Sequence, residues 1–215
     1  MLVNRKIESS KLLLVEGIED LHLFTALIDY MIENEDGCEK LTDIQLWKYD
    51  GGGNLKKDLK VIRLSREYKT ILKKIAITSD AEDNAESKFQ SITHHLTNNG
   101  YPCPATQLTP TESNPSVVVL TIPCTGQGMI EDICLESVKN DPAMCCVDKY
   151  FDCLNAELTE NGLDVPSNTS KAKLQAFLAS RKKPNLRLGT AAKRKCYPFE
   201  NAVFDEMKEI LRLML

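Results

Sequence analysis

The sequence contains few of the residues that build histidine- or cysteine-based metal centres. It has only three histidines, and its eight cysteines include no Cys-x-x-Cys pair, so zinc-finger spacing is absent. No apolar run approaches the ~20 residues of a membrane-spanning helix, and the run near the N-terminus is too short for a signal peptide. We therefore expect no membrane attachment, no disulfide framework and a reducing, cytoplasmic setting.

A general excess of positive charge is absent as well. The formal net charge is −4 at pH 7, which argues against binding nucleic acid through bulk positive potential alone. Basic residues are unevenly placed, however, because the segment from residue 181 to residue 195 is locally positive. With 215 residues, 42% of them hydrophobic, the chain can form one large domain, or one core with a smaller appendage.

A short apolar stretch near the N-terminus organises the rest of the chain. Residues 12–15 are apolar without a break, which predicts a strand buried on both faces. Glu16 and Gly17 end this strand, and apolar residues then recur at the spacing of one helix face up to Ile32. Glu16 therefore follows the carboxyl end of a central strand, where open α/β sheets place their ligands.

The same alternation of strand and helix continues along the chain. Strands are predicted at residues 44–49, 74–79 and 117–122, each followed by a helical pattern. Because helical crossovers join parallel strands, this predicts the α/β class, with a mostly parallel sheet of about four strands and helices on both faces. From residue 141 the pattern is helical only, with three amphipathic helices. We expect a core of residues 1–140 and a helical extension of residues 141–215 packed on it.

The turn after the second predicted strand is rich in glycine. Residues 50–54 are Asp-Gly-Gly-Gly-Asn, and no Gly-Lys-Ser/Thr follows, so this turn is not a P-loop. Asn54 is the predicted N-cap of the next helix, whose apolar face carries Leu55, Leu59 and Ile62.

Acidic residues follow the predicted strands at their carboxyl ends. Glu16 follows the first strand, Asp50 the second, Asp80 and Glu82 the third, and Glu131 the fourth. In a parallel sheet these ends share one edge, and clustered carboxylates repel each other unless one is protonated or a cation lies between them. Hard divalent cations such as Mg²⁺ and Mn²⁺ match such oxygen ligands. The alternative is that the acids cap the helices that follow.

Several short stretches, taken in order, carry a family resemblance. They are Leu14-Val15-Glu16-Gly17 with Asp20, Asp50-Gly51-Gly52-Gly53-Asn54-Leu55, Asp80-Ala81-Glu82, Gly128-Met129-Ile130-Glu131-Asp132, and Ser170-Lys171-Ala172. Together they resemble the Toprim domain of topoisomerases, primases and OLD-family nucleases, and within that fold a small stand-alone bacterial branch. The resemblance covers roughly residues 8–138 and continues more weakly to the C-terminus.

The resemblance implies a set of metal ligands. In the Toprim family a glutamate after the first strand and an Asp-x-Asp after a later strand bind Mg²⁺. It therefore implies Mg²⁺ or Mn²⁺ at Glu16 and Asp80, which would also be the catalytic residues, with Glu82, Asp83 and Glu131 completing the metal shell. The second aspartate of the family pair is Glu82 in this chain, unless its role moves to Asp83.

Two functions are implied by the same resemblance. The first is a metal-dependent nuclease, or a related phosphoryl-transfer protein, that acts on nucleic acid. The second is a non-catalytic interaction module that binds an ATPase partner of the kind found with OLD-type nucleases. A lysine often lies near nuclease-type sites, and Lys193 and Lys195 are candidates, although solvated surface charge is the simpler interpretation.

Overall fold

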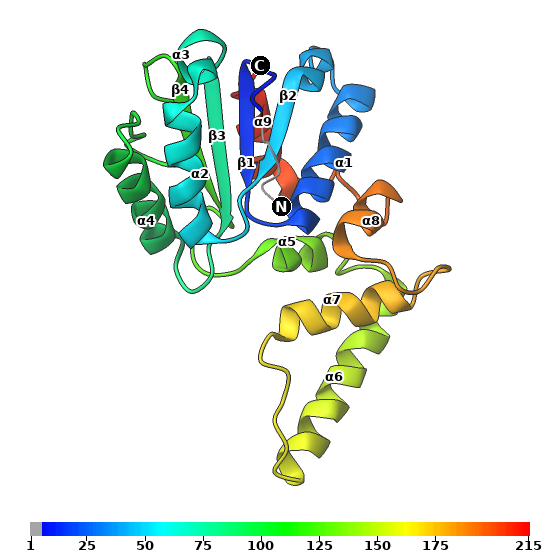
Figure 1. Ribbon diagram of the computed structural model, residues 1–215. Helices are drawn as coiled ribbons and strands as arrows, with labels where there is room; N and C mark the ends of the chain where they lie inside the picture. Colours follow the sequence, from blue (N-terminus) through cyan, green and yellow to red (C-terminus); the bar gives the residue numbers. More distant parts are fainter. Residues whose placement is uncertain (1–5) are drawn as a thin grey trace.

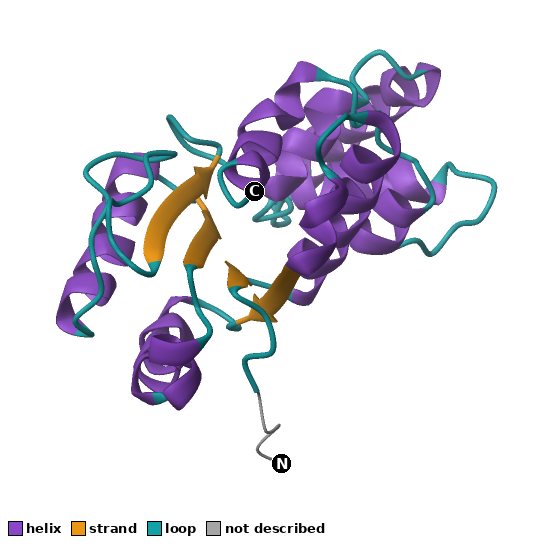
Figure 2. Cartoon of the chain, turned by 90° about the horizontal axis from the view of Figure 1, so that it is seen from above, coloured by secondary structure: helices purple, strands orange, loops and turns teal. Residues whose placement is uncertain are grey.

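Four parallel strands form the centre of the molecule. The structure is a computed structural model that describes residues 6–215. The strands are β1 (Lys11–Val15), β2 (Ile44–Lys48), β3 (Lys74–Asp80) and β4 (Ser116–Ile122), in the order β2-β1-β3-β4. Every pairing between them is parallel, so the predicted α/β class is confirmed (Figure 1 and Figure 2).

Strand β1 lies in the interior of the sheet, as its unbroken apolar sequence predicts. All five of its residues are buried, and Leu13 is in register with Leu46 of β2 and Ala76 of β3. Successive side chains point to opposite faces of a sheet, so Leu13 joins the apolar core on one face and Leu12 joins the core on the other. Residues 12–15 of the strand are all apolar because both of its faces are packed.

Helices cover both faces of the sheet (Figure 2). One face carries α2 (Gly52–Leu64), the short α3 (Arg66–Thr70) and α4 (Ala85–Asn98). The other face carries α1 (Ile18–Asn34) and α9 (Asp205–Arg212), and the larger apolar core lies there. A 3₁₀ turn, η1 (Glu39–Asp43), leads from α1 into β2.

The predicted cap of α2 is wrong. The helix begins at Gly52, and its N-cap is Gly51, whose φ of 89° is a left-handed conformation that glycine adopts without strain. Asn54 lies within the first turn, where its side-chain amide donates to the carbonyl of Asp50 over 2.8 Å. The sequence argument placed the helix start three residues late because a cap with no side chain leaves no signal.

The C-terminal third is helical, as predicted. After α5 (Ile130–Ser137) come α6 (Pro142–Glu160), α7 (Thr169–Ala179), α8 (Leu188–Lys193), η2 (Ala202–Phe204) and α9. Helix α8 packs against α1 and α9 packs against β4, whereas α6 packs on α7 and α7 on α5. Figure 1 shows α6 and α7 extending past the carboxyl edge of the sheet, and we name them the arm. Helices α3 and α8 were not predicted, because five or six residues are too few for a periodic pattern.

The arm and the sheet share one apolar core. Buried Phe151 of α6 and Phe177 of α7 belong to the same cluster as Leu13 of β1. The division at residue 140 stays a prediction. All eight cysteines are free thiols. Among the helices of residues 6–215, none has the length and apolar character needed to cross a membrane.

Candidate functional site

A cavity of about 520 Å³ lies at the carboxyl edge of the sheet, bounded by the first turns of α1 and α5 and by the residues of α7 and α8 that face them. We name it the acid cavity, because five acidic residues line it: Glu16, Glu19, Asp20, Asp80 and Glu131. Lys171 of α7 and Arg187, the residue before α8, line the same cavity. It therefore places acids and bases together at the edge where parallel sheets bind their ligands.

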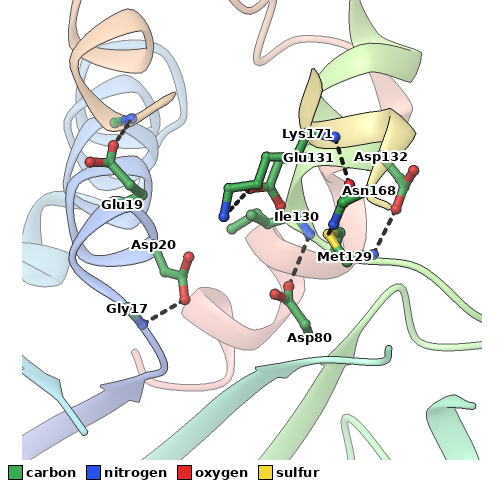
Figure 3. A network of polar contacts seen from close by, with 11 residues as sticks. Gly17, Glu19, Asp20, Asp80, Met129, Ile130, Glu131, Asp132, Asn168 and Lys171 are labelled. Atoms are coloured by element: carbon green, nitrogen blue, oxygen red, sulfur yellow. Dashed lines mark hydrogen bonds and ion pairs between the residues drawn. The ribbon is translucent and has the colours of Figure 1, made fainter. Parts of the chain in front are cut away.

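Two of these five acids come from the ends of neighbouring strands. Glu16 directly follows β1, Asp80 is the last residue of β3, and these strands are paired in parallel, so both side chains reach the same edge. The Ser79 hydroxyl donates to Glu16 Oε2 over 2.7 Å. The backbone N–H of Ile130 donates to Asp80 Oδ1 over 2.9 Å and joins β3 to the start of α5 (Figure 3).

The other three acids, Glu19, Asp20 and Glu131, come from the first turns of helices. Asp20 accepts a hydrogen bond from the N–H of Gly17 over 2.8 Å, which fixes its carboxylate at the N-terminus of α1 (Figure 3). Glu131 lies in the first turn of α5, with 12% of its side chain exposed, and its Oε1 is 3.8 Å from the Lys171 ammonium. Negative charge is favoured at both positions by the unpaired N–H groups of a helix N-terminus.

Both helices begin with the tripeptide Ile-Glu-Asp, and each copy also anchors a later helix. In α1, Glu19 Oε2 accepts from the backbone N–H of Gly189 over 2.7 Å, which joins α8 to the cavity. In α5, Asp132 accepts from the N–H of Met129 over 2.8 Å and from the hydroxyl of Ser170 in α7. Glu19 and Asp132 therefore hold the wall of the cavity that α7 and α8 form.

The cavity is electrostatically crowded. Burial, and then the negative charges of Glu16 and Glu131, raise the pKa of Asp20 to about 6, although the N–H of Gly17 lowers it. Burial, and then the negative charge of Asp20, raise the pKa of Asp80 to about 8, against the lowering by the N–H of Ile130. Asp80 is therefore protonated at neutral pH, which is how a carboxylate cluster relieves its repulsion when no cation is bound.

The carboxylate oxygens of the acid cavity suit a hard cation that keeps part of its water shell better than a cation bound by protein ligands alone. Within residues 6–215, no three His, Cys, Asp or Glu side chains form a ready-made metal cluster. Asp20 and Asp80 each use one carboxylate oxygen to accept a backbone N–H, which leaves the second oxygen for another partner. Mg²⁺ usually keeps several of its waters and takes only one or two carboxylates, so such an open set suits it.

The structure brings together only part of the predicted site. Glu16, Asp80 and Glu131 share the acid cavity. Glu82 lies outside it, because its backbone bridges to Gly128 with a φ of 53° and its carboxylate pairs with Lys88 over 2.8 Å. Asp83 is exposed and does not line the cavity either.

Three other residues considered from the sequence also lie elsewhere. Asp50 is exposed and pairs with Lys48 over 2.6 Å. Lys193 and Lys195 line a different cavity, and the basic residues at the acid cavity are Lys171 and Arg187. Lys171 belongs to a stretch that carries the family resemblance, whereas Arg187 was marked only as one of the basic residues of the positive segment from residue 181 to residue 195.

Asp20 is the site residue that sequence reasoning missed. An acid in the first turn of a helix is normally explained as a cap, and Asp20 does cap α1. The available signal was the repeated Ile-Glu-Asp at the starts of two helices that both follow strands of the sheet. Parallel strands bring the starts of those helices to one edge, so the repeat predicted that their acids would meet.

The fold and the site define a class: a parallel α/β protein with a carboxylate-lined cavity at the carboxyl edge of its sheet. The chain belongs to the family described as "Protein of unknown function (DUF3226)", whose model matches residues 10–215. Comparison with curated proteins and with solved structures gives no match.

Proposed function

We propose that the acid cavity binds Mg²⁺ or Mn²⁺ and that the chain is a metal-dependent nuclease, or a related phosphoryl-transfer protein, of the Toprim type. The observation that supports this is the meeting of Glu16, Asp20, Asp80 and Glu131 in one cavity, with the pKa of two of them raised. Crowded carboxylates cost stability in the metal-free fold, and such a cost is characteristic of functional sites.

Glu16, Asp20 and Asp80 are the proposed metal ligands, with Glu131 bound directly or through water. Asp20 takes the place that the sequence argument gave to Glu82 or Asp83, because it lines the cavity and they do not. A divalent cation bound there would polarise a phosphoryl oxygen and lower the pKa of a water for in-line attack.

The basic side chains of the cavity fit the substrate of such a reaction. Arg187 can donate two parallel hydrogen bonds to non-bridging phosphate oxygens, and Lys171 supplies a point charge. The hydroxyl of Ser79 orients Glu16, which is then available to accept or return a proton. The proposed substrate is a nucleic acid phosphodiester. The metal ion would balance the negative charge of the carboxylates, and the phosphate group would then contact both the metal ion and the two basic side chains, Lys171 and Arg187.

Thermal unfolding in the presence of divalent cations tests the metal site. Millimolar Mn²⁺ or Mg²⁺ should raise the melting temperature of the wild-type chain by mass action, because only the folded state brings the carboxylates together. Asp80→Asn should abolish this shift and any cleavage of single- or double-stranded DNA and RNA. Glu82→Gln is the matched control: it removes an acid close in sequence but outside the cavity, and both properties should remain.

The proposal fails if Mn²⁺ leaves the melting temperature of the wild-type chain unchanged and no nucleic acid is cut. It also fails if Glu82→Gln and Asp80→Asn lose the metal response equally. In the first case the acids are helix caps and anchors for α7 and α8.

The second candidate is a non-catalytic module that binds another protein, for which an ATPase is the partner suggested by the Toprim resemblance. The observation that favours it is that three large apolar side chains are exposed: Tyr150 of α6, and Leu163 and Val165 of the segment between α6 and α7. Substitution of Leu163 and Val165 by serine should leave a metal response intact under the first function. Under the second function it should abolish binding of the partner.

A further inference from the structure

A groove of about 490 Å³ lies where α2 leads into α3, at the end of the sheet opposite the acid cavity (Figure 1). We name it the basic groove, because half of the described residues that line it are Arg or Lys and none is acidic: Arg63, Leu64, Ser65, Arg66, Lys69 and Asn99. Within residues 6–215, its three basic side chains form no ion pair with another residue. Their positive charge can therefore serve a partner.

Arg63 is held in place at the basic groove. Its guanidinium carbon lies 4.3 Å from the centre of the Tyr68 ring, and its Nε donates to the carbonyl of Gly100 over 3.3 Å. The two terminal nitrogens of an arginine can donate parallel hydrogen bonds to one carboxylate. A carboxylate partner therefore meets an oriented donor here, beside the exposed side chains of Arg66 and Lys69.

The basic groove belongs to a positive segment of an acidic chain. Residues 56–74 contain eight Lys or Arg and two acids, although the whole chain has a net charge of −4. Neither acid lines the groove, because Asp58 accepts a hydrogen bond from Trp47 Nε1 over 2.9 Å and Glu67 lines a different hollow. The groove therefore favours a negatively charged partner.

Exposed apolar side chains distinguish this groove from the other positive segment of the chain. Leu64 is 76% exposed, and Val61 and Ile71 of the same stretch are exposed as well. The segment from residue 181 to residue 195 contains none of the large apolar side chains that are exposed in the described chain. Apolar groups rimmed by polar residues mark interaction surfaces. Phosphate groups would pair with the basic residues but would leave Leu64 uncovered, so a protein partner fits better.

The end of α6 and the loop that follows it carry the opposite charge. Residues 150–165, which we name the acidic tip, contain four acids and no Lys, Arg or His. All four acids are exposed and form no ion pair within the described chain: Asp152, Glu157, Glu160 and Asp164. The tip also exposes three large apolar side chains: Tyr150, Leu163 and Val165. Six of the eight large apolar side chains exposed in the described chain therefore lie on two surfaces of opposite charge.

The two surfaces cannot meet within one molecule. Figure 1 shows α3 and the C-terminal end of α6 at opposite ends of the fold. Two copies placed side by side and antiparallel would instead bring each acidic tip to the basic groove of the other copy. In such a two-fold pair the same contact forms twice, as in most closed dimers of identical chains.

We propose that the basic groove docks the acidic tip of a second copy of this chain, with Arg66 and Lys69 facing the acids of the tip and Leu64 packing on its apolar side chains. Charge complementarity and the pairing of the exposed apolar groups both support this partner. The proposal does not rest on the metal site. It gives the exposed side chains of the second candidate function a partner that needs no other protein.

Sedimentation equilibrium of the full chain tests the contact directly. A reducing buffer is used so that the exposed thiols of α6 cannot form disulfides between copies. The weight-average mass at low salt should rise with protein concentration above that of one chain, 24.1 kDa. Roughly 0.5 M salt should weaken the association, because exposed charges are then screened.

Reversal of charge on each surface gives the sharpest test. The groove variant is Arg66→Glu with Lys69→Glu, and the tip variant is Glu160→Lys with Asp164→Lys. Each variant alone should raise the dissociation constant for self-association by at least about tenfold, because like charges then face each other. An equimolar mixture of the two variants should associate again in a 1:1 ratio, since each reversed surface then meets its reversed partner.

The matched control is Lys182→Glu with Lys183→Glu, which changes the net charge as much as the groove variant does. Both lysines are exposed and lie outside the groove, so self-association should be unchanged. Leu64→Ser should weaken association without any change of charge, which diffuse electrostatic attraction would not produce. Asp80→Asn should leave association unchanged, so failure of the metal-site proposal would not remove this one.

Three results would overturn the proposal. One is a wild-type chain that sediments as a monomer at every concentration, including one whose groove instead binds heparin or anionic vesicles. Another is equal weakening by the control and by the groove variant. The last is a mixture of the groove and tip variants that stays monomeric although both variants have the circular dichroism spectrum and melting temperature of the wild type.

Discussion

The carboxyl groups of Asp20 and Asp80 enter the acid cavity from α1 and β3, and both point into the space between α1 and α5 (Figure 3). Burial, followed by the negative charge of Asp20, raises the pKa of Asp80 from 3.8 to about 8. The metal-free fold therefore holds a proton on Asp80 at neutral pH. Loss of the Asp80 carboxylate should therefore stabilise the metal-free protein but remove metal binding, and both effects can be measured.

Asp80→Asn should stabilise the metal-free protein at alkaline pH. Because the folded state holds the Asp80 proton more tightly than the unfolded chain, the free energy of unfolding falls as pH rises from 3.8 to about 8. Asparagine escapes this loss, since it is neutral and its amide oxygen can still accept the N–H of Ile130. We expect a gain on the order of 2 kcal/mol in EDTA above pH 8, or roughly 4–8 °C in melting temperature.

The same pair of proteins provides its own control at acidic pH. Below about pH 3 Asp80 is protonated in both the folded and the unfolded wild-type chain, so wild type and Asp80→Asn should have nearly equal stability. A variant that is less stable than wild type at both pH values would show that Asp80 is a structural cap and not a strained site residue.

Metal binding should release protons, and metal affinity should rise with pH. A cation at Asp80 must displace the proton that this residue holds up to a pH of about 8, so apparent affinity for Mn²⁺ should increase between pH 6 and pH 8. Calorimetry in buffers of different ionisation enthalpy measures the number of protons released. Asp20→Asn removes the negative charge that raises the pKa of Asp80, so this variant should bind more weakly but with a shallower pH dependence. An affinity that is constant across this range would contradict the proposed ligand role of Asp80.

The fold was predictable from local patterns, because its strands carry unusually clear ones. Packing on both faces gives β1 and β4 the apolar runs at residues 12–15 and 117–120, and short helical crossovers leave the parallel arrangement as the expected topology. That topology was enough to place Glu16 and Asp80 at one edge. The position of the arm was not predictable, since it depends on contacts between residues far apart in sequence, such as the one between Asp132 and Ser170.

The candidate site was only partly predictable for a related reason. Which acidic side chains line the cavity depends on the local backbone conformation of the residues that carry them. The spacing of acids in the sequence does not reveal that conformation. The left-handed backbone of Glu82 directs its side chain to Lys88, whereas the first turn of α1 directs Asp20 into the cavity. Arg187 could not be found from the sequence, because α8 brings it to the site from the far end of the chain.

Loss of either basic residue of the acid cavity should weaken nucleic acid binding more than it changes the fold. Arg187→Ala and Lys171→Ala should each reduce the affinity for an oligonucleotide. Each should also lower the slope of log Kd against log salt concentration by the amount expected for the loss of about one phosphate contact. Equilibrium binding at several salt concentrations measures both effects. Lys60→Ala, an exposed lysine of α2 on the opposite face of the sheet, should change neither. Equal effects at Lys60 and Arg187 would contradict a defined phosphate path.

Gly189→Ala should disturb the wall of the acid cavity through packing alone. A Cβ atom at Gly189 would lie 2.2 Å from the Cβ of His22 and 3.0 Å from the carbonyl oxygen of Glu19, so α8 would have to move away from α1. Overpacking of this kind costs about 1–3 kcal/mol, or roughly 2–12 °C in melting temperature for a chain of this size. The shift would also lengthen the hydrogen bond from the N–H of Gly189 to Glu19. It would move Arg187 as well, because Arg187 lies two residues before Gly189.

The matched control for this substitution is Gly53→Ala in the first turn of α2. No atom lies within 4 Å of a Cβ built at Gly53, and its φ lies outside the left-handed region, so alanine should be neutral or stabilise the fold by ~0.4–1 kcal/mol. Differential scanning calorimetry of both variants gives the comparison, and oligonucleotide binding then separates the two effects of Gly189→Ala. If the close contact between α8 and α1 positions Arg187, the Gly189 variant loses affinity at a temperature where it is still fully folded. Full affinity in a folded Gly189→Ala protein would show that Arg187 reaches its ligand without α8 being fixed on α1.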